Sequence, residues 1–352
     1  MTRPPPRALL HSISRWFQRD PVVAVGAFGK SGVVNGHQEV AGDATSGMVE
    51  TARILYYDGA LPNCARWETD LAGQDRVLSK YVLRWAGGRG FFCVVSPVAE
   101  GGATEAAFAP FVSCVEMDST FGLDLVATSI AGLEEAQPSL LASPPARWPE
   151  ILAPLRATLS KAVGDFGQRT PEERHRQLLS ALQMGLSPLG NQLVPWLGSL
   201  AEELKLPLTL PGSPPPRGGP TVVSRFADAP RLTSDALADG KTWSALLESV
   251  GFGHVERWLI CDPNVHSVRI FVGRPRDRDF SVLWRSTDAA GEHPTPIAGS
   301  RSNMLRAPLT AWLHGAGLWN EAVACAVGEA QHGSIGGGSP SPDAPSPPAQ
   351  DD

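Results

Sequence analysis

The residues of this chain that are best suited to bind a phosphate group lie in a glycine-rich stretch after an apolar run. Ala24, Gly29, Lys30 and Ser31 have the spacing of a relaxed P-loop in which alanine replaces the first glycine. Such a loop needs backbone N–H groups around the phosphates, and a helix that begins immediately after the hydroxyl residue. Residues 32–37 read GVVNGH, which disfavours a helix. A structural turn is therefore favoured, and a nucleotide-binding or nucleotide-hydrolysing protein stays the alternative.

Other patterns that would indicate catalysis or metal binding do not emerge from the sequence. No two histidines lie three or four residues apart, and the cysteines form no Cys-x-x-Cys motif. Ser96 precedes Pro97 and fits a turn better than a nucleophile, because no Gly-x-Ser-x-Gly elbow surrounds any serine. We therefore expect no enzymatic activity, no metal and no cofactor.

Two fragments of the chain resemble the TagF (ImpM) family, which is associated with bacterial type VI secretion. Residues 26–30 are similar to the family's opening turn of glycine, two aromatics, glycine and lysine. Residues 91–116 resemble the strand, Pro/Ser-containing loop and second strand that follow in the family. The matching positions are Gly26, Phe28, Gly29, Lys30, Ser96, Pro97, Pro110 and Phe111. The similarity covers about residues 20–160.

The chain departs from the family pattern at several of these places. Gly32 stands where proline is usual, residues 35–37 replace a Gly-Asp pair, and no arginine precedes Pro110. The resemblance is thus to a divergent member. It implies a non-catalytic, cytoplasmic accessory protein of type VI secretion, a post-translational repressor that binds a forkhead-associated scaffold protein.

A few side chains are suited to contact a protein partner. Arg274, Arg276 and Arg278 lie in one turn, and guanidinium groups match the oxygens of an anionic partner such as phosphothreonine. Trp85 precedes a Gly-Gly pair and has the setting of a loop aromatic. The alternatives are that the arginines are simply solvated and that the indole lies in the core.

Composition limits the class of protein. Of the 352 residues, 42% are hydrophobic, which is enough for a sizeable core. The net charge is −6, and the sequence lacks the clustered lysines and arginines that bind nucleic acids. The five cysteines lie far apart, mostly in apolar runs, as in a reduced cytoplasmic protein. We find neither a secretory signal nor an apolar run long enough to cross a membrane, so we expect no nucleic-acid partner and no membrane insertion.

An amphipathic segment lies near the start of the chain, in an N-terminal extension of residues 1–20. Leu9, Leu10, Ile13, Trp16 and Phe17 recur at helical spacing. Such a helix would lie on a membrane, dock on a partner or pack on its own domain. The short length and few cations favour packing on its own domain.

The hydrophobic pattern predicts the α/β (α+β) class, with a mainly antiparallel sheet flanked by helices. Strands are expected at residues 22–27, 91–95 and 111–117, the last two as an antiparallel pair and all three in one sheet. Expected helices are 149–163, 171–184 with Thr170 as N-cap, 193–204 and 241–250.

The chain is expected to form two lobes. Residues 21–205 form a TagF-like α/β domain, the Pro/Gly-rich residues 206–220 a linker, and residues 221–332 a second small α+β lobe. The second lobe is predicted to contain a three-stranded meander of residues 256–262, 267–273 and 279–284. Residues 333–352 lack aromatics and are expected to be a disordered tail.

Overall fold

A computed structural model of the chain describes a large part of its residues. These are residues 22–29, 38–60, 76–78, 80–99, 108–167, 170–204, 225–253, 255–275, 279, 284–286, 311–315 and 317. The expected N-terminal extension, the linker 206–220 and the tail 333–352 lie outside the described residues, as do Lys30, Arg276 and Arg278.

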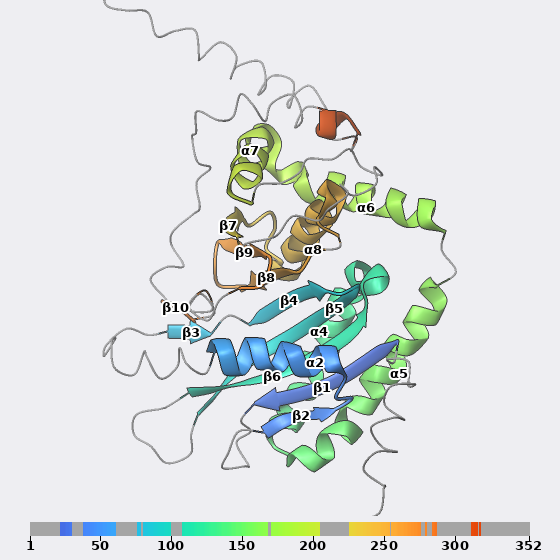
Figure 1. The fold of residues 1–352 in the computed structure, drawn as a ribbon, viewed down its shortest axis with the longest axis vertical. Coiled ribbons are helices and arrows are strands. Elements are labelled where there is room, and N and C mark those ends of the chain that lie inside the picture. Colours follow the sequence, from blue (N-terminus) through green and yellow to red (C-terminus); the bar gives the residue numbers. More distant parts are fainter. Residues whose placement is uncertain are drawn as a thin grey trace, which may run out of the picture.

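One eight-stranded sheet organises the described residues, in the order β2-β1-β6-β5-β4-β8-β9-β7 (Figure 1). Every neighbouring pair in it is antiparallel. Its strands are β1 Val23–Gly29, β2 Gln38–Gly42, β4 Tyr81–Ala86, β5 Arg89–Ala99, β6 Phe108–Asp118, β7 Arg225–Pro230, β8 Arg257–Cys261 and β9 Ser267–Val272. A separate two-stranded sheet pairs β3 Arg76–Leu78 with β10 Trp284–Ser286.

Helices connect and cover these strands. They are α2 Ser46–Ala52, η1 Arg53–Ala60, α4 Ser119–Leu141, η2 Pro145–Arg147, α5 Trp148–Phe166, α6 Pro171–Leu186, η3 Ser187–Gln192, α7 Leu193–Leu204, α8 Ala236–Leu247 and η4 Glu248–Phe252. The α+β class with a mainly antiparallel sheet is therefore confirmed.

The predicted strand pair is confirmed in detail. β5 and β6 pair over eleven residues each, with Phe91 opposite Glu116 and Ala99 opposite Phe108. β1 lies on the other side of β6, with Val23 opposite Met117. The two strands extend well beyond the apolar runs that revealed them, because backbone pairing continues through Ser96 and Pro97.

The helices α5, α6 and α7 lie where the sequence predicts them. Thr170 accepts from the Glu173 backbone, and the Glu173 side chain accepts from the Thr170 backbone, which forms a capping box before α6. The long helix α4 was not predicted. Its buried positions include Leu125, Ile130 and Leu133, and Asp118 caps it by accepting from the Thr120 N–H.

Both faces of the sheet are covered. One face packs Leu83, Val94, Val115 and their neighbours against α4, α5, α7 and α8. The other face packs Phe91 and alternate strand residues against α2 and η1, and α2 crosses the near side of the sheet in Figure 1. This explains why β1, β4 and β8 have apolar residues on both faces rather than alternating ones, apart from the buried Arg84 and Arg257.

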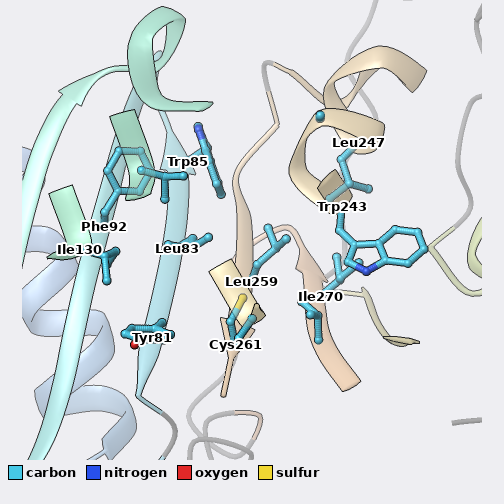
Figure 2. Packing of buried hydrophobic residues seen from close by; sticks show 14 of the residues in the cluster. Tyr81, Leu83, Trp85, Phe92, Ile130, Trp243, Leu247, Leu259, Cys261 and Ile270 are labelled. Atoms are coloured by element: carbon cyan, nitrogen blue, oxygen red, sulfur yellow. The ribbon is translucent and has the colours of Figure 1, made fainter. Parts of the chain in front are cut away.

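The strands that were assigned to a second lobe extend the same sheet. β8 pairs with β4, from Tyr81 opposite Cys261 to Trp85 opposite Arg257. Figure 2 shows the joint core, in which Leu83 and Tyr81 of β4 lie beside Leu259 and Cys261 of β8, and Trp243 of α8 lies farther to the right, next to Ile270. One core therefore spans the expected linker instead of two separate ones.

The predicted meander is wrong in its third strand. β8 and β9 pair as expected, but the other neighbour of β9 is β7, with Phe226 opposite Phe271. Trp284 belongs to β10 and pairs with Leu78 of β3. The buried apolar residues of β7 are the small Ala227 and Ala229, whereas the large Phe226 is exposed, and this weak pattern hides the strand in the sequence.

Candidate functional site

The residues that resemble the TagF signature meet on three adjacent strands. Gly29 of β1 lies opposite Phe111 of β6, and Phe111 lies opposite Ser96 of β5. One residue further along, Pro97 lies opposite Pro110. Fragments that are far apart in the sequence thus form one structural unit, which we call the signature corner (Gly26, Phe28, Gly29, Ser96, Pro97, Pro110 and Phe111).

Gly29 is a structural requirement of this corner. Its φ is +104°, a conformation that side-chain-bearing residues rarely adopt. A Cβ atom at this position would lie 2.6 Å from the carbonyl oxygen of Pro110. The register of β1 against β2 also shifts between Ala27 and Gly29, as at a β-bulge. The corner therefore depends on glycine to bring β1 close to β6.

The aromatic and polar members of the corner serve packing. Phe28 and Phe111 are both fully buried. The Phe111 ring meets Trp148 of α5 edge-on, with 5.3 Å between ring centroids. Ser96 accepts a hydrogen bond of 2.5 Å from the side-chain amide of Gln137 in α4. These contacts give Ser96 a positioning role between sheet and helix.

The phosphate-loop alternative is not favoured by this geometry. Gly26 and Ala27 pair with both β2 and β6, so the stretch that would bend around a phosphate is an interior strand of the sheet. The next described element is β2, which is antiparallel to β1, whereas a P-loop continues into a helix. Lys30 and Ser31 themselves lie outside the described residues.

Trp85 is not a partner contact, in contrast to the hypothesis from its sequence setting. Its side chain is 1% exposed and meets Phe92 at 5.6 Å between centroids. The Arg257 guanidinium lies 4.9 Å from the Trp85 ring, and burial lowers the pKa of Arg257 to about 10 although Glu248 opposes that shift. The glycines after Ala86 form the turn between β4 and β5, and Trp85 lies inside the hairpin, opposite Gly90.

Arg274 lies near the surface and is held by acidic groups. Its guanidinium is 3.6 Å from the Glu50 carboxylate and 3.9 Å from the Asp58 carboxylate. An anionic partner would therefore compete with α2 and η1 for this side chain. The other two arginines of the predicted cluster, Arg276 and Arg278, lie outside the described residues.

A buried arginine that the sequence analysis did not single out anchors α2 to the sheet. Arg84 of β4 is 1% exposed and donates to Thr51 at 2.6 Å, to Glu50 at 3.2 Å and to Glu256 at 3.1 Å. Its guanidinium lies 5.0 Å from the rings of both Phe91 and Trp258. The only sequence signal is a charged residue within an otherwise apolar run.

The outer face of α2 and η1 carries exposed apolar side chains over this anchor. Val49 and Tyr57 are 48% and 38% exposed, and Arg53 lies between them at four-residue spacing. We call Val49, Arg53, Tyr57 and Asp58 the α2 face. It presents an aliphatic and an aromatic side chain beside charged groups, and tyrosine and arginine are enriched among the residues that dominate protein-binding energy.

The opposite side of the molecule has a groove of about 650 Å³ between α4, α6 and α8. Lys241, Asp124 and Glu248 give it mixed charge. None of the described site residues predicted from the sequence lines it. We place the candidate site at the α2 face, because Arg274, a partner contact predicted from the sequence, pairs there with Glu50 and Asp58.

Cys93 and Cys114 face each other in register between β5 and β6, on the side of the sheet that α2 covers. Together with Cys261 they are buried free thiols, as predicted for reduced core residues. Burial raises the pKa of Cys114 well above its ordinary value, and the neighbouring Cys93 and Glu116 add to this effect. The thiol is thereby kept protonated.

The described part of the chain contains neither a metal-binding cluster nor a helix that could span a membrane. Its His, Cys, Asp and Glu side chains form no group of three or more that could hold a metal ion. Among its helices, none combines the length and apolar composition needed to cross a bilayer. No family model, curated protein or solved structure matches this chain.

Proposed function

We propose that this protein is a non-catalytic accessory protein of type VI secretion that represses the system by binding a protein partner. The observation that carries the proposal is the signature corner. Two fragments that resemble the TagF family at separate places in the sequence come together on β1, β6 and β5, with Gly29, Phe111 and Ser96 in one row. Their arrangement in one row supports the proposal that the two fragments belong to one motif.

The proposed binding surface is the α2 face. Repression by binding requires a surface that favours one state of the partner over another. Val49 and Tyr57 supply exposed apolar area, and Arg53 and Asp58 supply charged groups beside it. The occupant we propose is the forkhead-associated scaffold protein that the family resemblance implies. In this account the signature corner and Arg84 hold the surface in place, and the protein acts in the cytoplasm.

The proposal is tested by changing the amount of the protein in its own host. Overproduction is expected to lower the quantity of type VI substrates in the culture supernatant, and deletion of the gene is expected to raise it. A pull-down with the full chain is expected to recover a scaffold component of the system. Unchanged secretion in both strains, with no such component recovered, would remove the proposal.

A titration with ATP or GTP in the presence of Mg²⁺ tests the nucleotide alternative. We expect no micromolar binding, because the backbone of Gly26 and Ala27 is engaged in strand pairing on both sides. Micromolar affinity that Lys30→Ala abolishes would replace the repressor proposal with a nucleotide-binding function.

A further inference from the structure

A groove of about 630 Å³ runs between α5 and the start of β1. Its walls are mainly apolar, with Val22, Val23, Ala153, Ala157, Val163 and Gly164 beside the polar Arg156 and Ser160. The Arg156 guanidinium pairs with Asp43 at 2.7 Å. Val22 is 55% exposed, so an apolar side chain at its edge remains open to solvent. At Gly164 an added Cβ atom would meet nothing within 4 Å, which shows that the space above this part of α5 is open.

The chain enters the described structure at the wall of this groove. Val22 lines the groove, and residues 1–21 are joined directly to it. The amphipathic pattern of residues 9–17 ends at Phe17, five residues before Val22. Five extended residues reach about 17 Å. The part of α5 from Ala153 to Gly164 is also about 17 Å long at 1.5 Å per residue, so the whole groove is within reach of this segment.

The connection is suited to a change of direction. Pro21 has no backbone N–H and disfavours a helical conformation at Asp20, so a helix that ends near Phe17 does not continue into β1. A nine-residue helix is about 13 Å long, which is shorter than the groove. Its apolar side chains, Leu9, Leu10, Ile13, Trp16 and Phe17, are the chemical complement of the groove walls.

We propose that residues 9–17 bind in the α5 groove of the same molecule. The segment is tethered, so its effective concentration at the groove is in the millimolar range for a short flexible connection. A separate partner or a second copy has to compete with this local supply. A membrane is a poorer match, since surface-bound helices carry many cations on their polar face, whereas residues 9–17 contain Arg15 as their only lysine or arginine.

The inference does not depend on the secretion role, because it concerns a contact within one chain. In the proposed contact, residues 9–17 cover Val22 and the outer side of α5 in the same molecule. Release of the segment would expose an apolar groove on the side of the sheet opposite the α2 face.

Hydrogen–deuterium exchange of the full-length protein tests this proposal. We expect the amides of residues 10–17 to exchange at least about tenfold more slowly than an unstructured peptide of the same sequence. Ala157→Trp fills the groove and is expected to abolish this protection. Thr158→Trp places the same side chain on the exposed part of α5 outside the groove and should leave protection intact. Leu10→Glu with Phe17→Glu should also abolish it without changing the exchange of α5.

The proposal is overturned by several results. Unprotected amides in the wild-type chain, or protection that survives Ala157→Trp, would show that the segment does not occupy the groove. Protection that increases with protein concentration would assign the contact to a second copy. Protection that appears only after addition of anionic lipid vesicles would assign it to a membrane surface.

Discussion

Replacement of Gly29 by alanine is expected to destabilise the protein strongly, because two independent costs coincide there. The first is the backbone conformation at φ +104°, which costs a residue with a side chain about 1–3 kcal/mol. The second is steric. The new Cβ would lie 2.6 Å from the Pro110 oxygen, whereas ordinary contact begins at 3.4 Å, so β1 and β6 must separate by about 0.8 Å. Overpacking of this kind costs about 1–3 kcal/mol.

Gly88→Ala is the matched control, since it shares the first cost and lacks the second. Gly88 has φ +77°, and a Cβ atom there meets nothing within 4 Å. Both substitutions also lower the entropy of the unfolded chain equally, by about 0.4–1 kcal/mol, and this effect cancels in their comparison. Gly29→Ala should therefore be less stable than Gly88→Ala by about 1–3 kcal/mol, the steric cost alone.

Urea unfolding followed by tryptophan fluorescence measures this difference. The expected result is a lower midpoint for Gly29→Ala at an unchanged slope, since the slope reports the surface exposed on unfolding. Gly29→Val should be worse still. If Gly29→Ala and Gly88→Ala unfold within about 0.5 kcal/mol of each other, the close approach of β1 to β6 does not fix the signature corner.

Two further predictions concern buried groups beneath α2. Arg84→Met should lower stability by about 1.5–3 kcal/mol because Thr51, Glu50 and Glu256 lose the hydrogen bonds that this guanidinium donates. Arg147→Met at an exposed ion pair should change stability by less than about 1 kcal/mol. Equal midpoints in urea for the two variants would refute the anchoring role of Arg84. Folding raises the pKa of the Cys114 thiol above its unfolded value near 9.0. The contribution of this thiol to folding stability is therefore fully present below pH 9 and is lost as the pH rises above that value. Stability should therefore decline above about pH 9, and Cys114→Ala should flatten the decline; a slope that this variant leaves unchanged would contradict the assignment.

The pattern of apolar residues was sufficient to predict the central strands and several helices. β1 is an apolar run, β5 and β6 each contain one, and the Thr170–Glu173 box marks the start of α6. α4 was missed although its apolar residues recur at helical spacing, because Gly122, Gly132 and Pro138 disguise it. Glycine and proline favour turns, so local propensity alone predicts turns at these three positions.

Long-range pairing was beyond the reach of sequence patterns. Nothing local indicates that Leu83 lies opposite Leu259 across an expected linker, and this pairing turns two lobes into one sheet. The same holds for Trp85, whose burial follows from neighbours in β8 and α4 that are distant in sequence. The resemblance identified the corner residues, and only the register shows that Gly29, Phe111 and Ser96 form one row.

The central claim, repression through the α2 face, is tested most directly by complementation of a deletion strain. Val49→Glu with Tyr57→Glu places charges on two exposed apolar positions of this face. Met184→Glu with Phe226→Glu is the matched control, because these side chains are 70% and 57% exposed elsewhere on the surface. Secretion of type VI substrates should be repressed by the wild type and by the control pair, and should stay at the level of the deletion strain with the α2-face pair at equal protein abundance. Full repression by the α2-face pair would contradict the account.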